Sequence, residues 1–185
     1  MSASASDVCF LRDEPAQSDA SKTRLGSLRT AILRDGVQFC DGTSQSRRPL
    51  AWVTDLREVL YRPEHLKVAA DLLWARLKRF DPQCIGGMTM SAEQLVCGIL
   101  QAAWAEGREL SGFSVRRTPK SYGRQRQIEG VRPWPGARIV IVDDLINSGG
   151  TMARVADIIR PFDPRIAAVA AVLDFENPSA AISVQ

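Results

Sequence analysis

The residues of this chain that are best suited to chemistry lie in one short stretch, residues 137–151. Two carboxyl groups, Asp143 and Asp144, directly follow four aliphatic residues at 139–142, and a small polar pair, two glycines and Thr151 come after them. Four consecutive aliphatic residues predict a strand that is buried on both faces, since a half-exposed strand would alternate. Residues 152–160 then have helical character. A strand, a glycine-rich turn and a helix N-terminus form an anion site, because unpaired backbone N–H groups and the helix dipole both favour phosphate.

The acidic pair distinguishes this stretch from other phosphate-binding loops. A P-loop requires Gly-Lys-Ser/Thr after its glycines, and the stretch contains no lysine. A dinucleotide-binding turn places Gly-x-Gly-x-x-Gly directly after its strand, without carboxylates before the loop. Two carboxylates before a phosphate-binding turn suit a sugar phosphate, because the turn can bind the phosphate while the acids bind ribose hydroxyls. The alternative is an ordinary buried strand and turn with an incidental Asp-Asp pair.

The composition is that of an ordinary globular protein. Of the 185 residues, 45% are hydrophobic and 24% are charged, and the formal net charge is +3, which does not by itself argue for a nucleic-acid partner. The four cysteines show no C-x-x-C spacing and there is a single histidine, so a zinc site is not expected. The N-terminus lacks the pattern of a signal peptide and no long apolar run follows. We therefore expect a cytoplasmic protein without a membrane segment.

The rest of the chain predicts alternating helices and strands. Helices are expected from residue 22 to about residue 36 and over 63–80, 92–106 and 152–160, with Ser91 and Gln94 matching a capping box for the third. Strands are expected over 83–87, 110–115, 139–142 and 165–175, with an irregular hairpin over 37–52. This order predicts a parallel sheet with crossover helices and a ligand site at the carboxyl ends of its strands. Residues 1–21 are expected to form a disordered tail, and residues 22–185 a single domain whose part at about 22–60 forms a small lid.

A second chemical feature is the cationic segment from Arg116 to Arg126, in which Arg, Lys and Gln residues are interrupted by Pro and Gly. Taken alone, such a run is most often a solvated face or a nucleic-acid patch. In a chain that also carries a sugar-phosphate site, its cations could stabilise the negative charge that develops on a departing pyrophosphate.

These two stretches together resemble the type I phosphoribosyltransferase family, which uses phosphoribosyl pyrophosphate (PRPP), and within it the orotate phosphoribosyltransferases. Residues 139–151 are similar to the PRPP motif of that family. The segment Arg116-Arg117-Thr118-Pro119-Lys120-Ser121-Tyr122-Gly123 resembles the Arg-Lys-x-x-Lys-x-His-Gly loop of the orotate enzymes, with Tyr122 in place of the usual histidine. Residues 86–91 stand where the pyrophosphate loop of the family begins, without its nearby lysine.

The resemblance implies a fold, a reaction and an assembly. The fold is α/β, a parallel twisted sheet with flanking helices and a small N-terminal lid region. The reaction is transfer of a 5-phosphoribosyl group from PRPP to a nitrogen of a base, with release of pyrophosphate and with orotate, in pyrimidine nucleotide synthesis, as the leading substrate. Mg²⁺ is the expected cofactor and is held by oxygens of the substrate, with no direct protein ligand. The expected assembly is a homodimer.

The resemblance also implies a role for each candidate residue. Lys120, which falls on the mobile lysine of the family loop, Asp143 and Asp144 are the catalytic candidates. Arg154 falls on the arginine that contacts the orotate ring and is the candidate for binding the base. The candidates for binding PRPP are Arg116, Arg117, Asp143, Asp144, Leu145, Ile146, Asn147, Ser148, Gly149, Gly150 and Thr151.

Two alternatives stay open at the level of the sequence. One is a transferase for a different base, either a purine or a uracil-like base. The other is a PRPP-sensing regulator that binds ligand or RNA without turnover, which the cationic segment and the missing lysine in residues 86–91 support. The modest net charge argues against a nucleic-acid partner. Salt-dependent RNA binding without pyrophosphate release would favour the regulator.

Overall fold

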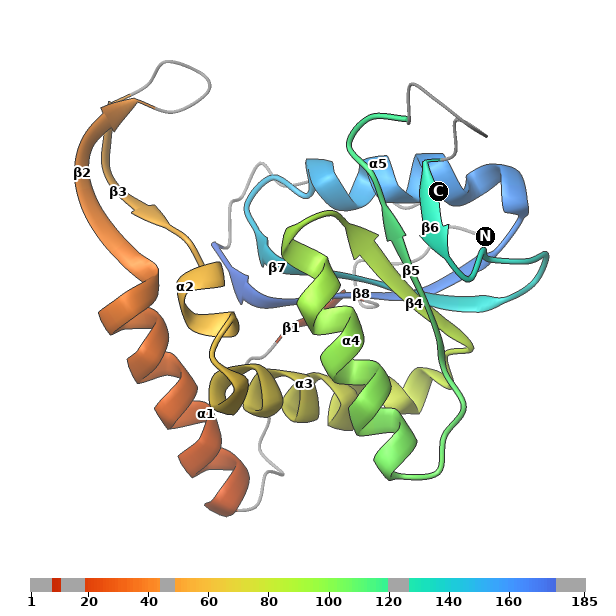
Figure 1. Cartoon of the computed structure of the whole chain (residues 1–185), viewed down its shortest axis with the longest axis horizontal. Helices are drawn as coiled ribbons and strands as arrows, with labels where there is room; N and C mark the ends of the chain where they lie inside the picture. Colours follow the sequence, from red (N-terminus) through yellow and green to blue (C-terminus); the bar gives the residue numbers. More distant parts are fainter. Residues whose placement is uncertain (1–7, 11–18, 44–48, 120–126, 176–185) are drawn as a thin grey trace. The chain divides into compact units, whose positions relative to one another are not determined.

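The computed structural model describes residues 8–10, 19–43, 49–119 and 127–175 (Figure 1). The chain divides into two compact units, of which unit 1 comprises Met1–Asp13 and Ala70–Gln185 and unit 2 comprises Glu14–Ala69. All of the candidate site residues that the structure describes belong to unit 1.

Unit 1 is built on a six-stranded sheet with the strand order β1-β8-β7-β4-β5-β6. Its strands are β1 (Val8–Phe10), β4 (Cys84–Met88), β5 (Ser111–Val115), β6 (Ile128–Gly130), β7 (Arg138–Ile146) and β8 (Arg165–Asp174). Neighbouring strands run parallel, except that β6 runs antiparallel to β5. This architecture confirms the predicted α/β class and the parallel sheet.

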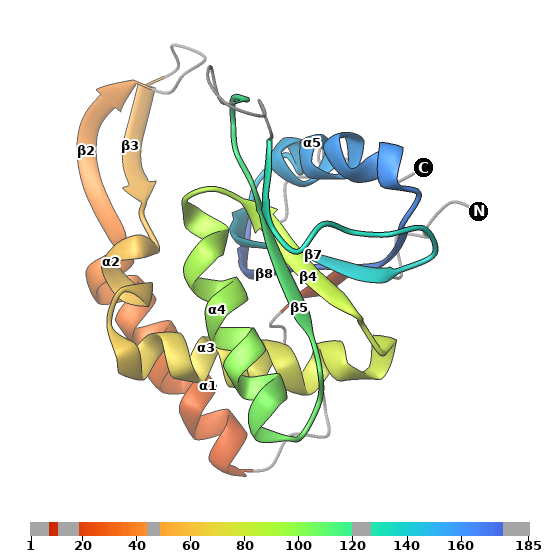
Figure 2. The same ribbon diagram turned by 45° about the vertical axis from the view of Figure 1, so that its right-hand side comes forward.

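Helices cover both faces of this sheet. The helix α4 (Ser91–Ala105) lies on one face and α5 (Gly150–Ile159) on the other, as Figures 1 and 2 show. The boundary between the two units falls within the residues of α3 (Pro63–Leu77), which ends in a 3₁₀ turn, Lys78–Phe80, while α5 ends in the 3₁₀ turn Arg160–Phe162. The helices and strands predicted in this part of the chain are therefore confirmed, with shifts of a few residues at their ends.

The core of unit 1 forms around β7, the strand predicted from the aliphatic run. Ile139 and Ile141 pack in one buried cluster with Met152, Val155 and Ile159 of α5. Val140 and Val142, which alternate with them along the strand, are also fully buried. Both faces of β7 are thus covered, as a continuous apolar run requires.

Strand β7 is longer than the sequence predicted. It continues through the acidic pair to Ile146, because the backbone of this part stays in register with β8, with Asp143 opposite Ala171 and Leu145 opposite Leu173. The carboxyl groups therefore lie on a strand, not in the loop that follows it.

The prediction of a disordered N-terminal tail is wrong for residues 8–10 and 19–21. Val8–Phe10 form the edge strand β1, which pairs in parallel with Val169, Ala170 and Ala171 of β8. The open edge of β8 supplies the backbone partners for this short segment, and composition alone does not reveal a partner so distant in sequence. Residues 19–21 begin the helix α1, and residues 1–7 and 11–18 lie outside the described part of the chain.

Unit 2 contains a helix and a hairpin, as predicted. Its elements are α1 (Asp19–Ala31), a π-helical turn (Ile32–Gly36), β2 (Val37–Thr43), β3 (Pro49–Thr54), α2 (Arg57–Leu60) and the first part of α3. The strands β2 and β3 pair antiparallel as a two-stranded sheet. Leu25, Leu28, Leu56, Val59 and Leu60 are buried. The function of this region as a lid stays a prediction.

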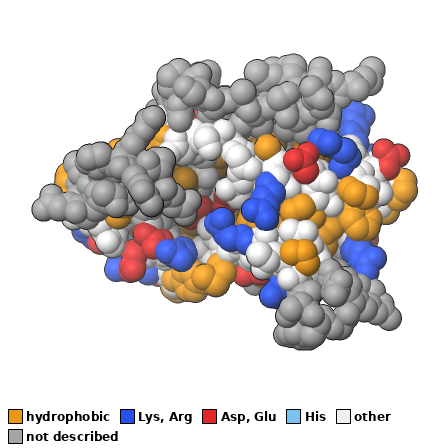
Figure 3. All heavy atoms as spheres, turned by 90° about the horizontal axis from the view of Figure 1, so that it is seen from above, with side chains coloured by type: hydrophobic (Ala, Val, Ile, Leu, Met, Phe, Trp, Pro, Cys, Tyr) orange, Lys and Arg blue, Asp and Glu red, His pale blue; other side chains and the backbone are white. Residues whose placement is uncertain are grey.

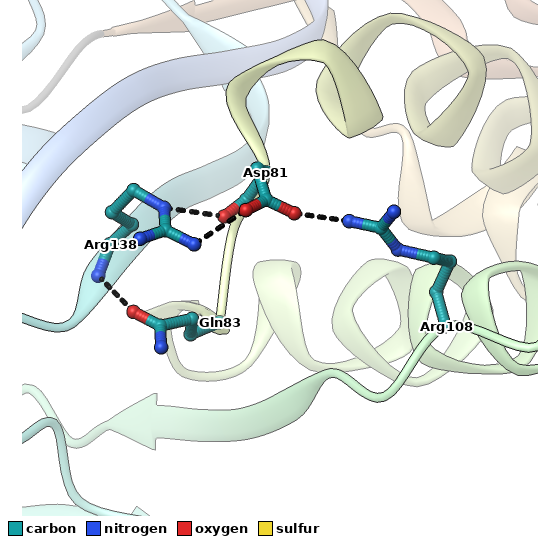
Figure 4. Close-up of polar contacts among 4 residues, drawn as sticks. All are labelled: Asp81, Gln83, Arg108 and Arg138. Carbon is teal, nitrogen blue, oxygen red and sulfur yellow. Dashed lines mark hydrogen bonds and ion pairs between the residues drawn. The ribbon is translucent and has the colours of Figure 1, made fainter.

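The amino ends of β4 and β7 are joined by a polar cluster (Figure 4). Arg138 donates from Nη2 to the Asp81 carboxylate at 2.6 Å and from Nε to the Asp81 carbonyl at 2.8 Å, and Arg108 donates to the same carboxylate. Gln83 accepts the backbone N–H of Arg138 at 3.1 Å. These contacts lie at the end of the strands that is remote from Asp143, and they hold the sheet together there.

Among the described helices, none is long and apolar enough to cross a membrane.

Gly87 of β4 tests how closely the layers of unit 1 pack. A Cβ atom at Gly87 would lie 2.1 Å from the carbonyl oxygen of Val142 and 2.5 Å from Cβ of Ala92. We expect Gly87→Ala to lower the free energy of unfolding by roughly 1–3 kcal/mol through overpacking, measured by urea denaturation. The control is Gly26→Ala in α1, where no atom lies within 4 Å of the new Cβ, and where alanine should be neutral or stabilise by about 1 kcal/mol. Equal stabilities of the two variants would contradict this account of the packing.

Candidate active site

The carboxyl ends of β4, β5 and β7 bring three of the candidate stretches together. The turn after β4 is joined to β5 by a hydrogen bond from the Thr89 N–H to the Val115 carbonyl at 2.8 Å. It is joined to β7 by a hydrogen bond from the Ser91 hydroxyl to Asp143 at 2.9 Å. The region that resembles a pyrophosphate loop, the start of the cationic segment and the acidic pair therefore share one edge of the sheet, where the topology predicts a ligand site.

The two carboxyl groups of the acidic pair are buried and held by hydrogen bonds. Asp143 and Asp144 are only 4% and 7% exposed. Asp143 Oδ1 accepts hydrogen bonds from the Ser91 hydroxyl at 2.9 Å and from the backbone N–H of Asp144 at 3.0 Å. Asp144 Oδ1 accepts the backbone N–H of Leu145 at 2.8 Å. A rigid strand and short local contacts thus fix both groups before any ligand arrives.

The environment of Asp143 raises its pKa to about 7. Burial is the main cause, because it disfavours the charged form, and the nearby Asp144 carboxylate adds to the effect. The hydrogen bonds from the Ser91 hydroxyl and the Asp144 N–H act in the opposite direction, since they stabilise the carboxylate. A ligand that donates hydrogen bonds to this group, or that brings a cation next to it, would stabilise its charged form.

The turn after β7 has the geometry of an anion site. Gly149 precedes α5 with a φ of 75°, a left-handed conformation that glycine adopts without strain. The helix begins at Gly150, whose N–H donates to the Ser148 hydroxyl at 3.4 Å, while the N-cap residue Gly149 has no side chain to offer. The first N–H groups of a helix have no partner within it, and the helix dipole places partial positive charge there. The predicted strand, turn and helix N-terminus are therefore confirmed, and the phosphate ligand of residues 145–151 stays a prediction.

The cationic segment is only partly described. Arg116 and Arg117 directly follow β5, whereas Lys120 lies outside the described residues. Nη1 of Arg116 lies 3.8 Å from a carboxylate oxygen of Glu129 in β6, and its backbone N–H donates to the Gln127 carbonyl at 2.8 Å. Arg117 is exposed. Arg116 thus lies near Glu129 of β6, and its role at pyrophosphate stays a prediction.

Arg154 lies in α5 and contacts the start of the cationic segment. Its Nη2 donates to the backbone carbonyl of Arg117 at 2.5 Å, across 37 residues of sequence. Through this contact Arg154, the residue predicted to bind the base, links α5 to the segment that follows β5. Arg154 is exposed, as a helix-surface arginine is, and its role in binding the base stays a prediction.

Sequence reasoning missed one partner of the acidic pair. Ser91 was predicted to cap a helix together with Gln94, and this prediction is wrong. Ser91 is the first residue of α4, Met90 occupies the cap position, and no side chain caps the helix. The hydroxyl reaches across to Asp143 instead, because β4 and β7 are neighbours in the sheet. The spacing of Ser91 and Gln94 carries no signal for that contact.

Comparisons with known proteins add to this geometry. Residues 110–182 match the model of the phosphoribosyl transferase domain family. The orotate phosphoribosyltransferase of Streptomyces coelicolor is 32% identical over 149 residues, covering 80% of this chain and 81% of that protein. The one from Rhodopirellula baltica is 28% identical over 163 residues, covering 85% and 84%. A solved structure of Mycobacterium tuberculosis H37Rv orotate phosphoribosyltransferase matches with a TM-score of 0.72 and 25% identity, covering 85% of this chain and 87% of that one.

The raised pKa of Asp143 predicts how the stability of the fold changes with pH. The folded protein holds a proton on Asp143 up to about pH 7, whereas an ordinary aspartate releases it near 3.8, so this contribution to stability is lost as the pH rises between those values. Asp143→Asn removes the charge and should raise the melting temperature relative to wild type increasingly from pH 4 to pH 8. The gain at pH 8 is on the order of a few kcal/mol, since one pKa unit corresponds to about 1.4 kcal/mol.

The control for this experiment is Asp157→Asn, which removes an exposed carboxylate from α5. Its melting temperature should keep a nearly constant offset from wild type over the same pH range. An offset for Asp143→Asn that does not grow with pH would mean that Asp143 is not held in its protonated form by burial.

Proposed function

The chain belongs to the orotate phosphoribosyltransferase family, and we propose that it transfers the 5-phosphoribosyl group of PRPP to a ring nitrogen of orotate, releasing pyrophosphate. The observation that supports this most directly is the acidic pair at the carboxyl end of β7, followed on the same strand–turn–helix unit by the N-terminus of α5. A sugar bound by the two carboxyl groups would hold its 5-phosphate next to the N-terminal N–H groups of that helix. The reaction belongs to pyrimidine nucleotide synthesis.

The proposed roles follow from the charges of the groups. Asp143 and Asp144 bind the ribose hydroxyls, and their negative charge stabilises the oxocarbenium-like sugar that forms as pyrophosphate leaves. Leu145 to Thr151 hold the 5-phosphate through backbone N–H groups and hydroxyls. Arg116, Arg117 and Lys120 neutralise the departing pyrophosphate. The chemistry then needs little more than positioning and charge, because the leaving group is already activated.

The donor set around the site fits a metal ion that is held by the substrate. Within the described ranges, no group of three or more His, Cys, Asp or Glu side chains could hold a metal ion. Mg²⁺ commonly keeps water and substrate phosphate oxygens as ligands and takes few from the protein. We therefore propose that PRPP binds with its own Mg²⁺, which would neutralise part of the charge on the pyrophosphate group.

Arg154 is the proposed contact to the base. A guanidinium group has five N–H donors in a fixed planar fork, and the hydrogen bond to the Arg117 carbonyl uses one nitrogen of that fork. The remaining donors suit a base with a carboxylate and ring carbonyls, which is the chemistry of orotate. The contact to Arg117 would hold the fork in place, so that the base meets a guanidinium with little freedom left to lose.

RNA binding without turnover, the alternative function, is less well supported because the formal net charge of +3 is modest for a nucleic-acid partner. On the face that Figure 3 presents, the described Lys and Arg side chains are interspersed with acidic, hydrophobic and uncharged groups. We also propose that the protein acts in the cytoplasm. We further propose that it forms a homodimer, because the resemblance to the family implies that the cationic segment reaches the active site of a partner subunit.

The proposed function is tested by measuring pyrophosphate release from PRPP and Mg²⁺ with orotate, uracil, adenine and hypoxanthine. Wild-type protein should release pyrophosphate with orotate, and Arg154→Ala should raise the KM for orotate by an amount that corresponds to roughly 1.5–3 kcal/mol, because one charged hydrogen bond is lost. The KM for PRPP should change little. Arg160→Ala, at the end of α5 and paired with Asp157, is the control and should behave as wild type. Release with a purine but not with orotate would reject orotate as the substrate.

Lys120 and the homodimer are tested together. Lys120→Ala should lower kcat by on the order of 10²–10³, the effect of removing one charge-stabilising donor, with little change in the KM for PRPP. Mixing this variant with the double variant Asp143→Asn, Asp144→Asn should restore part of the activity, since each hybrid dimer would contain one intact site. A raised KM with an unchanged kcat would limit Lys120 to substrate binding. Absence of recovery after verified subunit exchange would mean that the segment serves its own chain.

A further inference from the structure

Ser91 connects the turn after β4 to the acidic pair of β7. It is the first residue of α4 and is partly buried, and its hydroxyl donates to Asp143 Oδ1 at 2.9 Å. The two residues are 52 positions apart in the sequence. The hydroxyl does not cap α4, since the structure records no side-chain hydrogen bond at that cap. Its recorded partner is thus the first carboxyl group of the pair.

The surroundings of Asp143 make this hydrogen bond important for the orientation of its carboxyl group. Oδ1 accepts hydrogen bonds from the Ser91 hydroxyl and from the Asp144 N–H, and the Asp144 side chain is a further hydrogen-bond partner of the Asp143 carboxyl group. They restrict rotation of the carboxyl group and so determine where its other oxygen, Oδ2, points. Among the described residues, the charged neighbour that acts on Asp143 is Asp144 on the same strand. The strand β8 places Ala171 opposite Asp143, and β4 brings Gly87 next to the preceding Val142, so neither neighbouring strand adds a charge there.

We propose that Ser91 is a positioning residue for phosphoribosyl transfer, whose hydroxyl holds the Asp143 carboxylate in the orientation in which it meets the ribose hydroxyls of PRPP. This inference rests on the proposed role of Asp143. The turn after β4 and the start of α4 would then have two functions. The turn could contact pyrophosphate, and Ser91 would orient the Asp143 carboxyl group on β7.

The hydrogen bond also lowers the pKa of Asp143 relative to the value that burial and Asp144 alone would give. It stabilises the carboxylate and therefore works against burial, which raises the pKa of this group to about 7. Without the hydroxyl, the pKa of Asp143 rises further. Because the ribose is bound by the charged form, activity falls as the pH drops through this pKa, and loss of the hydroxyl moves that fall to a higher pH.

The test compares Ser91→Ala with Ser91→Thr in steady-state assays of PRPP and orotate from pH 5.5 to pH 9. Ser91→Ala should lower kcat/KM for PRPP roughly 10- to 100-fold at pH 7, the effect of one hydrogen bond to a charged group, and move the acidic side of the pH profile up by about one unit. The loss should shrink at high pH, where Asp143 is charged in both proteins. Ser91→Thr keeps the hydroxyl and should recover most of the activity and the original pH profile. Ser111→Ala, at the amino end of β5, is the control and should leave both unchanged.

Further measurements separate positioning from a general loss of structure. Circular dichroism and melting temperature verify that Ser91→Ala is folded, and calorimetry of PRPP binding at pH 6 and pH 8 should show a larger loss of affinity at pH 6. Should Ser91→Ala not fold, Ser91→Cys keeps the size of the side chain with a weaker donor and should give the same shift to a smaller extent. An equal loss at every pH would assign Ser91 to packing alone and overturn the proposal.

Failure of the inference can be distinguished from failure of the proposed function. If wild type releases pyrophosphate and Asp143→Asn is impaired, but Ser91→Ala matches wild type in kcat/KM and pH profile, the positioning role is wrong and the function stands. A Ser91→Thr variant as impaired as Ser91→Ala would also overturn the role of the hydroxyl. If wild type releases no pyrophosphate with any base, or if Asp143→Asn is fully active, the proposed function or the proposed role of Asp143 fails first, and the inference with it.

Discussion

The burial of two adjacent carboxyl groups at the carboxyl end of β7 is the interaction on which the site depends. A buried carboxylate is costly unless hydrogen bonds or an opposite charge stabilise it, and two neighbours add mutual repulsion. In this protein the stabilising donors are backbone N–H groups of Asp144 and Leu145 and the hydroxyl of Ser91. They are enough to fix the groups but leave the pKa of Asp143 near neutrality. Hydrogen-bond donors of a ligand, or a cation bound with it, would add to this stabilisation, and perturbed acids of this kind are typical of functional sites.

The close packing of β4 against β7 and α4 supports this arrangement of the carboxyl groups. Gly87 lies in β4 against the carbonyl of Val142, the residue directly before Asp143, and any side chain at Gly87 would collide with it and with Ala92 of α4. Because the strand and the helix can approach so closely, the first residue of α4 reaches the carboxyl group on β7. The glycine therefore contributes to the chemistry indirectly, by setting the distance that one hydrogen bond spans.

The two ends of the sheet use different stabilising groups. At the amino end, the Asp81 carboxylate binds Arg108 and Arg138, while Gln83 accepts a backbone hydrogen bond (Figure 4). Asp81 itself follows the 3₁₀ turn after α3 with a positive φ of 47°, and Asp163 follows the turn after α5 in the same way, with a φ of 50°. Each of these aspartates precedes a proline that leads into the next strand. Charged side chains thus close the amino end, whereas the carboxyl end presents backbone donors and buried acids to a ligand.

The parts of this protein that depend on local pattern could be predicted from its amino-acid sequence. The aliphatic run at 139–142 predicted β7, since four apolar residues in succession require cover on both faces. The glycines before Thr151 predicted the turn and the helix start, since few other residues adopt a positive φ without strain. The order of strands and helices predicted a parallel sheet, and that sheet in turn predicted the edge on which the site lies.

Which residues meet at that edge depends on the tertiary fold. The pairing of Val8–Phe10 with β8, the contact of Arg154 with Arg117, and the hydrogen bond from Ser91 to Asp143 all join segments that are far apart in the chain. Ser91 shows the reason most clearly, because its spacing from Gln94 is that of a helix cap. The periodicity of apolar residues in a segment predicts which of its faces are buried, but not which other segments cover those faces. Which hydroxyl reaches which carboxylate depends on the order of strands in the sheet and on the close approach that Gly87 allows, and a local pattern contains neither.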